Sequence, residues 1–575
     1  MRKVVFIVLA VMVLLSASAV LASEFHGAWP YLPPPNGHFN TYVTNSILGG
    51  SMYHDLIEQP MGMYYWATGT WEPLLATSWE LDKENSEFVV KLREGVKFND
   101  GSELTAQDIV DTFYIGYLMH WAVWRFIDKV EAVDKYTVKF HIAKPAPKIV
   151  LERYIIRERV RAHSVYGEYA KKIIDLLAEG KTRDSEEMKA LRVEFEKFRP
   201  KTIVGAGPYM IDPNSITEAQ LTLVKFPGYW DVKSLKIDKV VVYNGETPVV
   251  TPLVMSKEVD YATHGFPPAT EMQFKRLGAR ILRPPIYSGP AIYFNDDIYP
   301  FNLKEVRQAI AYAINKDENA YVSLGESAKR CEYMAGFSDN LVPLWLSEET
   351  RSKLNSYKYD PKKAEEILKS LGFHRDKDGV WVTDKGQRME YELSVPAEYA
   401  DWTAAAQNAA DQLTKFGIKV SVRGVTYSQH PTEVRQGRFQ LAIRDWGAGN
   451  PHPHFAFYTD LVSYNYLSGF GPGQNFPLTQ KTKAFGMVDL NDLVTRSGEG
   501  WNEEEQKAAV EKLAIAFNEL LPIVPLWERY GNNPAWDGVR VTNWPADDDP
   551  IYKNSPYADN FVTLMLMKGI LEPAK

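Results

Sequence analysis

The stretch that decides the fold spans residues 75–101 and reads LATSWELDKENSEFVVKLREGVKFNDG. Phe88, Val90 and Leu92 lie on one side of an alternating pattern, which predicts a half-buried strand. A turn at residues 94–95 leads into a second short strand at residues 96–98. The stretch therefore predicts two short strands joined by a tight turn.

A helix is predicted directly after these strands. Thr105 and Asp108 have the spacing of a capping box, in which each side chain binds a free backbone N–H of the first turn. Ile109, Val110 and Phe113, with Tyr117 one turn later, follow the 3.6-residue period of one buried helix face. A hairpin that leads into a capped helix is common, so this local signal alone does not identify a fold.

The first 22 residues have the pattern of a secretory signal peptide. Arg2 and Lys3 precede an apolar run, and Val20-Leu21-Ala22 suits a small-residue cleavage site. The residue after that site is Ser23 and not cysteine, so we expect no lipid anchor. An uncleaved membrane anchor is the less favoured alternative, because a spanning helix needs ~20 apolar residues. We expect an exported protein, located in the periplasm.

Length and composition narrow the class of protein. A chain of 575 residues has room for several domains. Its net charge of −8 argues against a nucleic-acid partner, which would require a basic surface. Cys331 is the only cysteine, so the chain cannot form an internal disulfide. The 15 Trp and 32 Tyr residues are enough to supply a ligand site with flat apolar surfaces.

Further segments carry clear local signals in a fixed order along the chain. Residues 170–199 form a charged amphipathic stretch that Gly180 to Asp184 divides into a helix pair. The later landmarks are VGAGPY at 204–209, FPGYW at 226–230, a helix NLKEVRQAIAYAINK at 302–316 capped by Asn302, a helix from Asp360-Pro361 to Leu371, a helix from Ala404 to Phe416, and a strand LLPIVPLW at 520–527.

Together these motifs, from about residue 55 to residue 530, resemble the signatures of family 5 solute-binding proteins, which deliver peptides, nickel or sugars to ABC importers. The resemblance is greatest to the oligosaccharide-binding members. It implies an α/β, periplasmic-binding-protein-like (type II) two-lobed fold with an extra inserted domain, three domains in all. It also implies a permease partner, hinge closure on a ligand, no catalysis and no cofactor.

The same resemblance implies where the domains lie along the chain. Domain I is expected from residues 23–50, 206–285 and 530–575. Domain II is the insertion at residues 51–205, and domain III runs from 286 to 529. In this family the ligand is held between domains I and III.

The loop RDWGAGNPHPHF at residues 444–455 bears on the choice between peptide and sugar. Peptide-binding relatives carry a carboxylate before a proline in this loop, which pairs with the amino end of the ligand. Here that place holds Gly449, Asn450, Pro451 and His452, and a buried ammonium without a partner costs several kcal/mol. Asn450 suits hydroxyl groups, which need donors and acceptors. We therefore expect a β-linked oligosaccharide of the cellobiose or mannobiose type. The alternative is a peptide whose amino end pairs with Asp445.

Aromatic side chains are the expected contacts for the flat faces of sugar rings. Trp446 in the same loop is the leading stacking candidate, and Trp402, Trp29 and Trp66 follow it. Trp527 and Glu528 end the closing strand and are included as candidates, although a buried strand end is the more common arrangement.

Three other constellations are weaker. His452 and His454 form a His-x-His pair with no third ligand nearby, so a metal site is not favoured. Cys331 has basic neighbours, yet a buried cysteine is the expected arrangement. A secreted carbohydrate-active enzyme would need two carboxylates across a cleft, and we find no motif for it. We expect a monomer with no metal and no catalytic residues.

Overall fold

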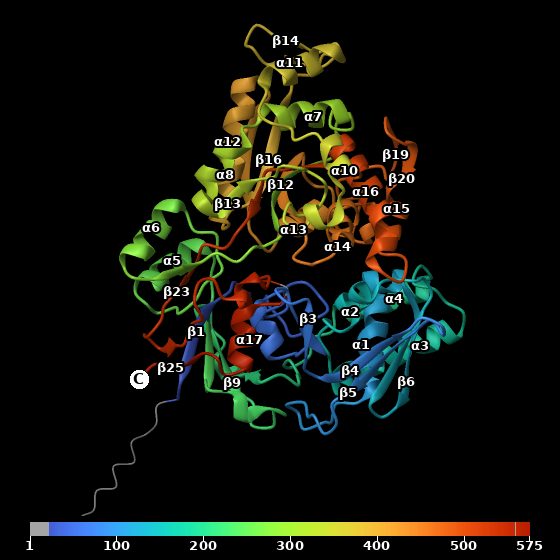
Figure 1. The fold of residues 1–575 in the computed structure, drawn as a ribbon, viewed down its shortest axis with the longest axis vertical. Helices are drawn as coiled ribbons and strands as arrows, with labels where there is room; N and C mark the ends of the chain where they lie inside the picture. The colour runs from blue at the N-terminus through green and yellow to red at the C-terminus, as the bar shows by residue number, and fades with distance from the viewer. Residues whose placement is uncertain (1–21, 558) are drawn as a thin grey trace, which may run out of the picture.

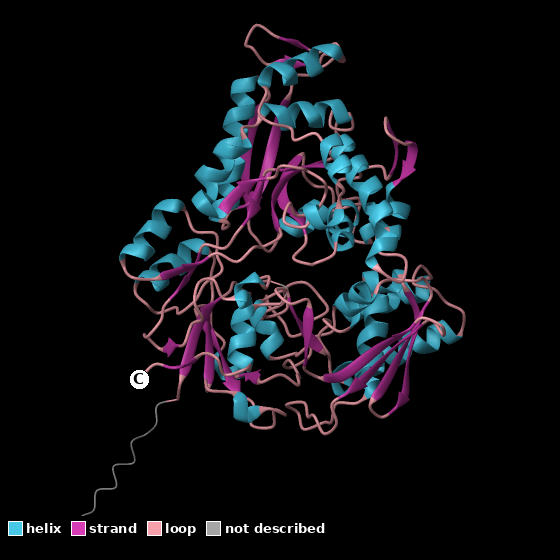
Figure 2. Ribbon diagram, viewed as in Figure 1, coloured by secondary structure: helices cyan, strands magenta, loops and turns pink. Residues whose placement is uncertain are grey.

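A computed structural model describes residues 22–557 and 559–575, and it is a mixed α/β structure built around three main sheets. Figure 1 shows one body at the top, formed by the yellow and orange part of the chain, and two bodies side by side beneath it. Each body carries helices against its strands, as the cyan and magenta ribbons of Figure 2 show. The expected signal peptide lies outside the described residues except for Ala22.

The inserted body at the lower right of Figure 1 contains residues 75–101, the stretch that predicts two short strands. Its antiparallel sheet has the order β4 (Ala76–Asp82), β5 (Glu87–Leu92), β7 (Thr137–Ile142) and β6 (Ile127–Asp134). The predicted strand at 88–92 is confirmed. Residues 96–98 form only an isolated bridge between Lys97 and Glu103, so the prediction of a second strand there is wrong.

Helices complete this body. They are α1 (Ala106–Leu118), α2 (Lys148–Ile155), α3 (His163–Ala178) and α4 (Glu186–Glu196). The capping box at the start of α1 is confirmed, because the amide of Thr105 donates to the carboxylate of Asp108 at 2.8 Å. The helix pair predicted for 170–199 is confirmed as the second half of α3 followed by α4, separated by residues 179–185.

The body at the lower left is built on a mixed sheet. Its strand order is β1 (Glu24–Ala28), β10 (Lys239–Tyr243), β9 (Gln220–Lys225) and β8 (Tyr209–Ile211), with β1 parallel to β10. Helices α5 (Thr247–Met255) and α6 (Pro268–Arg276) follow the sheet in sequence. The C-terminal helix α17 (Phe561–Met567) packs into the core of this body.

The upper body holds the largest sheet. Its order is β17 (Lys419–Val425), β16 (Glu390–Pro396), β18 (Leu441–Gly447), β12 (Ser288–Phe294) and β21 (Ile523–Pro525). Its longer helices are α7 (Lys304–Ala313), α8 (Lys316–Leu324), α11 (Pro361–Ser370), α12 (Ala400–Phe416) and α16 (Glu503–Leu520).

Helix ends in the upper body agree with the sequence analysis at two of three places. Asp360 caps α11 by accepting from the amide of Lys363 at 3.0 Å, and α12 ends at Gly417, which has a positive φ of 95°. The helix predicted for 302–316 is divided into α7 and α8, and Leu303 instead of Asn302 stands at its N-cap. The capping prediction for Asn302 is therefore wrong.

We propose that the three bodies are domains I, II and III with the limits given above, at the lower left, lower right and top of Figure 1 respectively. The strands of the domain II sheet, β4 to β7, come between β1 and β8 of the domain I sheet, and the strands of the domain III sheet follow β10. The short helix at Met52–Leu56, which those limits assign to domain II, packs into the same core as the domain I sheet, so we move the proposed start of domain II past this helix.

Two chain segments cross between domains I and III and lie side by side. The amide of Ile286 donates to the carbonyl of Arg529 at 3.1 Å, and Pro285 forms a bridge with Tyr530. Gly531 then donates to the carbonyl of Pro284 at 2.8 Å. A paired crossing of this kind is the arrangement that a hinge between two lobes needs.

Buried charges tie the C-terminal segment to domain II. Asp559 accepts from Arg153 at 2.7 Å and from Arg157 at 3.0 Å, and Arg157 also pairs with Asp55 at 2.6 Å. Because these carboxylates are buried, removing one partner would leave an uncompensated charge. The network therefore fixes the position of the segment that carries Ser555 and Tyr557.

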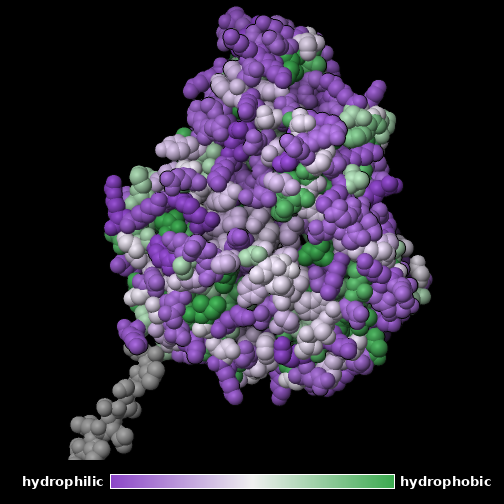
Figure 3. Space-filling view, in the orientation of Figure 1, coloured by the Kyte–Doolittle hydropathy of each residue, from purple (hydrophilic) through white to green (hydrophobic). Residues whose placement is uncertain are grey.

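The exterior carries no large apolar face in the view of Figure 3, where hydrophobic areas are small and separated by hydrophilic ones. Among the helices described for residues 22–575, none is both long and apolar enough to cross a bilayer.

Candidate ligand-binding cavity

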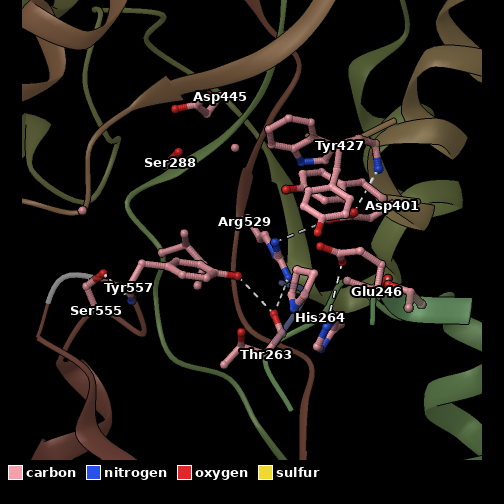
Figure 4. Close-up of a pocket in the computed structure, with 18 of the residues that line it drawn as sticks. Glu246, Thr263, His264, Ser288, Asp401, Tyr427, Asp445, Arg529, Ser555 and Tyr557 are labelled. Carbon is pink, nitrogen blue, oxygen red and sulfur yellow. Dashed lines mark hydrogen bonds and ion pairs between the residues drawn. The ribbon is translucent and has the colours of Figure 1, made fainter. Parts of the chain in front are cut away.

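A cavity of about 520 Å³ lies between domains I and III, close to the two crossing segments. Its size falls within the ~300–1,000 Å³ of small-ligand pockets. Figure 4 shows its walls, with the side chains of both domains turned toward one another. A ligand in this cavity would contact both domains, and such contacts favour the conformation in which the two domains are closed on the ligand.

The ends of secondary-structure elements supply the wall from domain III. Ser288 and Gly289 begin β12, Asp445 and Gly447 end β18, and Arg529 ends β22 (Trp527–Arg529). Tyr399, Asp401 and Trp402 stand at the start of α12, and Tyr427 follows β17. Side chains at element ends are held by the sheet and helix behind them, which gives them fixed positions.

Loops supply the wall from domain I. Trp29 and Pro30 follow β1, Glu246 and Thr247 open α5, and Thr263, His264 and Gly265 precede α6. Ser555 and Tyr557 come from the C-terminal segment that the Asp559 network holds in place.

Five aromatic side chains line the cavity. Trp29 meets the ring of Tyr557 edge to face, with 6.1 Å between centroids. Trp402 meets Tyr399 in the same way at 5.2 Å, and Tyr427 completes the set. The two tryptophans come from opposite domains, so a flat ligand between them would contact both lobes.

One arginine crosses between the lobes at the cavity. Arg529 Nη2 donates to the carbonyl of Thr263 in domain I at 3.0 Å, and Nη1 lies 3.8 Å from Asp401 Oδ2. Tyr557 donates to the same carbonyl at 3.0 Å. Figure 4 shows the contacts of Arg529 and Tyr557 with Thr263 as two dashed lines that meet at Thr263. Together the contacts join four chain segments around the cavity, which are the loop before α6, the start of α12, the end of β22 and the C-terminal segment.

Asp445 is already neutralised by its sequence neighbour. Arg444 Nη2 lies 2.5 Å from Asp445 Oδ1, and the same nitrogen contacts Tyr464. The Asp445 side chain is 37 % exposed, whereas that of Arg444 is 10 % exposed. The cavity therefore presents this carboxylate as one half of an ion pair.

Glu246 stands in a different environment. It is the N-cap residue of α5, yet its side chain caps no amide of that helix. Its nearest basic group is the imidazole of His264, whose Nε2 lies 3.9 Å away and donates to the carbonyl of Gly245 at 2.9 Å. Burial, and then the neighbouring Asp401, raise the pKa of Glu246 well above its ordinary value. Burial lowers the pKa of His264 to about 4, so the imidazole is neutral at pH 7.

The structure brings together three of the eight residues that the sequence proposed for the site. Trp29, Trp402 and Asp445 line the cavity. Their role in binding stays a proposal.

Trp446 lies elsewhere, although it was the leading stacking candidate. Its side chain is 1 % exposed, packs in the domain III core and donates from Nε1 to the carbonyl of Trp527 at 3.2 Å. Neighbouring residues of a strand face opposite sides of the sheet, and in β18 Asp445 lines the cavity while Trp446 does not. We therefore correct its expected role from ligand stacking to core packing.

Asn450 and Trp66 are also occupied by protein partners. Asn450 Oδ1 accepts from Arg153 of domain II at 2.8 Å, so it lies at a contact between domains II and III. Trp66 stacks on Tyr287 at 4.4 Å and donates to Asp559 at 3.0 Å. Neither residue lines the cavity.

The remaining two candidates end the closing strand and point into the protein. Trp527 is fully buried and donates to Asn319 at 3.1 Å. Glu528 accepts from Ser338, and Asn340 donates to it at 2.7 Å. Burial, followed by Asp339, raises the pKa of Glu528 to about 7. In this short strand the neighbour Arg529 reaches the cavity instead.

The other residues considered in the sequence analysis, the His452–His454 pair and Cys331, are buried inside the protein. His454 contacts Tyr154 of domain II at 2.9 Å and the carbonyl of Val494 at 2.8 Å. Cys331 is buried as expected, and burial raises its pKa. Within the described part of the chain, no group of three or more His, Cys, Asp or Glu residues is arranged to hold a metal ion.

The sequence analysis missed Glu246, His264, Asp401, Arg529 and the tyrosines 399, 427 and 557. Arg529 follows the candidate Glu528, and finding it would have required knowing which face of β22 meets the cavity. Asp401 precedes the candidate Trp402, and finding it would have required the exact start of α12. Glu246 and Tyr557 stand in loops without a local pattern.

Gly265 allows domain I to approach Asp401 closely. A Cβ atom at this glycine would lie 2.3 to 2.6 Å from the carboxyl atoms of Asp401. Because that clash exists only while the two lobes are together, we expect Gly265→Ala to disfavour the closed form and weaken ligand affinity about tenfold, or ~1.4 kcal/mol. Small-angle scattering and calorimetry would check it. An unchanged affinity would show that the two lobes do not depend on this approach.

Sequence comparisons give a consistent family. The model of the bacterial extracellular solute-binding proteins, family 5, middle region, matches residues 70–468. A glutathione-binding protein of Pectobacterium atrosepticum is 26 % identical over 397 residues, covering 67 % of each chain. One of Shigella flexneri is 24 % identical over 473 residues, covering 79 % of this chain and 80 % of the relative.

Solved structures share the fold over nearly the whole chain. A periplasmic oligopeptide-binding protein of an ABC transporter from Thermotoga maritima, solved with mannohexaose bound, has a TM-score of 0.74 at 22 % identity and covers 96 % of this chain and 99 % of its own. An oligopeptide-binding protein of Bacillus subtilis in complex with a nonapeptide has a TM-score of 0.73 at 16 % identity, with 96 % and 99 % covered. At these identities the likeness shows the type II periplasmic-binding-protein fold and no ligand.

Proposed function

Because the chain belongs to the family 5 extracellular solute-binding proteins of ABC importers, we propose that it captures an oligosaccharide between domains I and III and delivers it to a permease. The single observation that carries the proposal is the cavity, which has tryptophans from both lobes and polar side chains around them. The preferred ligand is β-linked and of the cellobiose or mannobiose type.

The chemistry of the cavity suits a sugar. Sugar rings present apolar C–H faces and hydroxyl edges, and Trp29 and Trp402 offer apolar surface from opposite domains. Ser288, Thr263 and Ser555 supply small polar groups around them. A structural neighbour that binds mannohexaose adds support from the same fold.

An oligopeptide is the alternative within the family, since the sequence relatives bind glutathione and a structural neighbour binds a nonapeptide. A peptide whose amino end pairs with Asp445 is less favoured, because Arg444 already neutralises that carboxylate at a distance of 2.5 Å. A peptide amine would need another partner.

Closure is the proposed mechanism of capture. A ligand that contacts both domains favours the closed form by the difference between its affinities for the two forms. We propose that the paired segments at residues 284–286 and 529–531 act as the hinge. The permease would then recognise the closed form of an exported, periplasmic monomer.

Transport and catalysis make different predictions. A secreted carbohydrate-active enzyme is the rival from another class, and the family relatives are binding proteins. We propose that the protein does not hydrolyse its ligand. Incubating the protein with cello- and manno-oligosaccharides and analysing the sugars would test this, since hydrolysis products would overturn the transport proposal.

A thermal-shift screen tests the choice of ligand. The protein from residue 23 to residue 575 would be heated with oligosaccharides and with short peptides in parallel. A ligand at a hundredfold excess over its Kd stabilises the folded form by about 2.7 kcal/mol. We expect stabilisation by sugars, and stabilisation by peptides alone would contradict the sugar proposal.

Trp29→Ala tests the contribution of domain I. Trp29 is half-buried in the cavity wall, so its removal should weaken oligosaccharide binding by about 1–3 kcal/mol, the scale of one large apolar contact. Calorimetric titration would measure the loss. The matched control is Trp501→Ala, which removes a half-buried tryptophan outside the cavity and should leave affinity unchanged.

A further inference from the structure

One carboxyl group of the cavity has no cationic partner, whereas each of the other two lies beside an arginine. Asp445 is paired with Arg444 at 2.5 Å, and Asp401 faces Arg529 at 3.8 Å. Glu246 is the remaining carboxyl group, and its only nearby nitrogen base is the buried imidazole of His264 at 3.9 Å. Within the described chain, no hydrogen bond is formed by the Glu246 side chain.

The same end of the cavity holds further unsatisfied polar atoms. Asp401 Oδ2, His264 Nδ1 and Arg529 Nε are buried and have no hydrogen-bond partner among the described residues. The side chains of Asp401 and His264 are each only 4 % exposed. Buried polar groups are normally hydrogen-bonded, so the two unpartnered acceptors of this set, Asp401 Oδ2 and His264 Nδ1, point to a donor group of a ligand.

Several alternatives for Glu246 can be excluded by its position. Its side chain does not cap α5, although it stands at the N-cap. It makes no structural ion pair of the kind that fixes Glu528 or Asp559. The groups that face it are His264 and, more remotely, Asp401, Arg529, Glu398, Tyr399 and Tyr427. Of the charged groups among them, Asp401 and Glu398 are acidic and Arg529 is basic.

We propose that the end of the cavity formed by Glu246, Asp401 and His264 is a subsite for a primary ammonium group of the ligand. The ammonium would lie against the Glu246 carboxylate, and its other hydrogens would reach Asp401 Oδ2 and a lone pair of the neutral His264 ring. An ammonium supplies three donors and one positive charge, and these suit the three acceptors, one of which is the unpaired Glu246 carboxyl group.

The subsite is distinct from Asp445. Figure 4 places Asp445 and Glu246 on opposite sides of the cavity, with Arg529 between them in the view. The inference rests on the proposed function only in taking this cavity as the ligand site. An amino sugar and the amino end of a peptide share the ammonium chemistry, so the test must separate these two sources.

The experiment uses matched pairs of probes in which acetylation removes the charge of the amine and adds one small group. They are a β-1,4-linked glucosamine disaccharide with its N-acetylated form, cellobiose, and a tripeptide with a free or an acetylated amino end. We expect the free amine of one pair to bind about 30-fold or more tightly than its acetylated form, as for a buried charge pair. Which pair shows the preference identifies the source.

Glu246→Gln is the informative variant, because it keeps the shape and removes the charge. It should remove most of the 30-fold preference, while Asp492→Asn, which changes an exposed carboxylate paired with Arg496 outside the cavity, should leave the preference in place. Equal binding of free and acetylated forms, or tighter binding of cellobiose than of either amine, would overturn the subsite but not the transport of sugars. Failure of every probe to bind would count against both.

Two readouts follow from the raised pKa of Glu246. Binding an ammonium requires the carboxylate, so affinity should rise with pH as long as the amine of the probe stays protonated, with proton release from Glu246 that calorimetry in two buffers detects. In the free protein the raised pKa means that stability falls as pH rises above the unfolded value of about 4.5. Glu246→Gln should therefore raise Tm at pH 7 and change it little at pH 4. A lower Tm at pH 7 would show a structural role for Glu246.

Discussion

Replacing Arg529 by alanine should both destabilise the free protein and abolish tight ligand binding. We expect the free energy of unfolding to fall by about 3 kcal/mol, because Asp401 loses its only nearby cation and the carbonyl of Thr263 loses a donor. The Arg529 side chain is 12 % exposed, so solvent would replace little of what is lost. Chemical denaturation would measure the change.

Two control variants separate charge from geometry. Arg529→Lys keeps the positive charge and should recover part of the stability, but it cannot reach Thr263 and Asp401 together. Arg496→Ala removes an arginine from an exposed helical pair with Asp492 and should cost less than about 0.5 kcal/mol. If Arg529→Ala unfolds at the same denaturant concentration as Arg496→Ala, the interdomain role of Arg529 is contradicted.

Trp446→Ala should cost about 3–5 kcal/mol of folding free energy, the usual range for removing a buried tryptophan. Trp446 is 1 % exposed and packs against the core beneath the cavity, with its indole N–H bound to Trp527. The main effect should therefore appear in denaturation, and the folded fraction should keep its affinity for ligand.

Trp402→Ala is the matched comparison, because Trp402 lies in the same domain and lines the cavity. Its loss should weaken ligand binding more than the loss of Trp446 does, when both variants are measured under conditions where they are folded. The reverse result, a stable Trp446→Ala that no longer binds, would return Trp446 to the ligand site and show that the wall of the cavity is misidentified.

The fold could be predicted from the sequence because its signals are local. The capping box of Thr105 and Asp108 and the Asp360 cap are settled by neighbouring residues. The six sequence motifs, found in a fixed order, together indicated the family, although none of them is specific enough alone. Local signals failed at Asn302, where the chain turns one residue later than its capping pattern suggests.

The site was harder to predict, because it depends on which face of an element meets the cavity. Asp445 and Trp446 are neighbours on one strand, as are Glu528 and Arg529, and in each pair only one residue lines the cavity. Trp446 was expected in the site because it is a large aromatic residue, but it is buried in the core behind the sheet. Asn450 suited hydroxyl groups, yet Arg153 from a distant part of the chain takes its carbonyl oxygen.

Residues brought together only by domain packing left no trace in the sequence. Glu246 and Asp401 are far apart in the chain and meet across the interface between the lobes, where Gly265 allows the approach. A pattern search reads one segment at a time, so it cannot find such a pair. The three-dimensional structure was needed to see it.

The most direct test of the account is a calorimetric titration of the wild-type protein and of Trp402→Ala with the oligosaccharide that stabilises the protein most. The account predicts one site per chain in the wild type, an intact sugar after the titration, and at least a tenfold loss of affinity in the variant. Equal affinity in the two proteins, or release of hydrolysis products, would contradict capture of a sugar in this cavity.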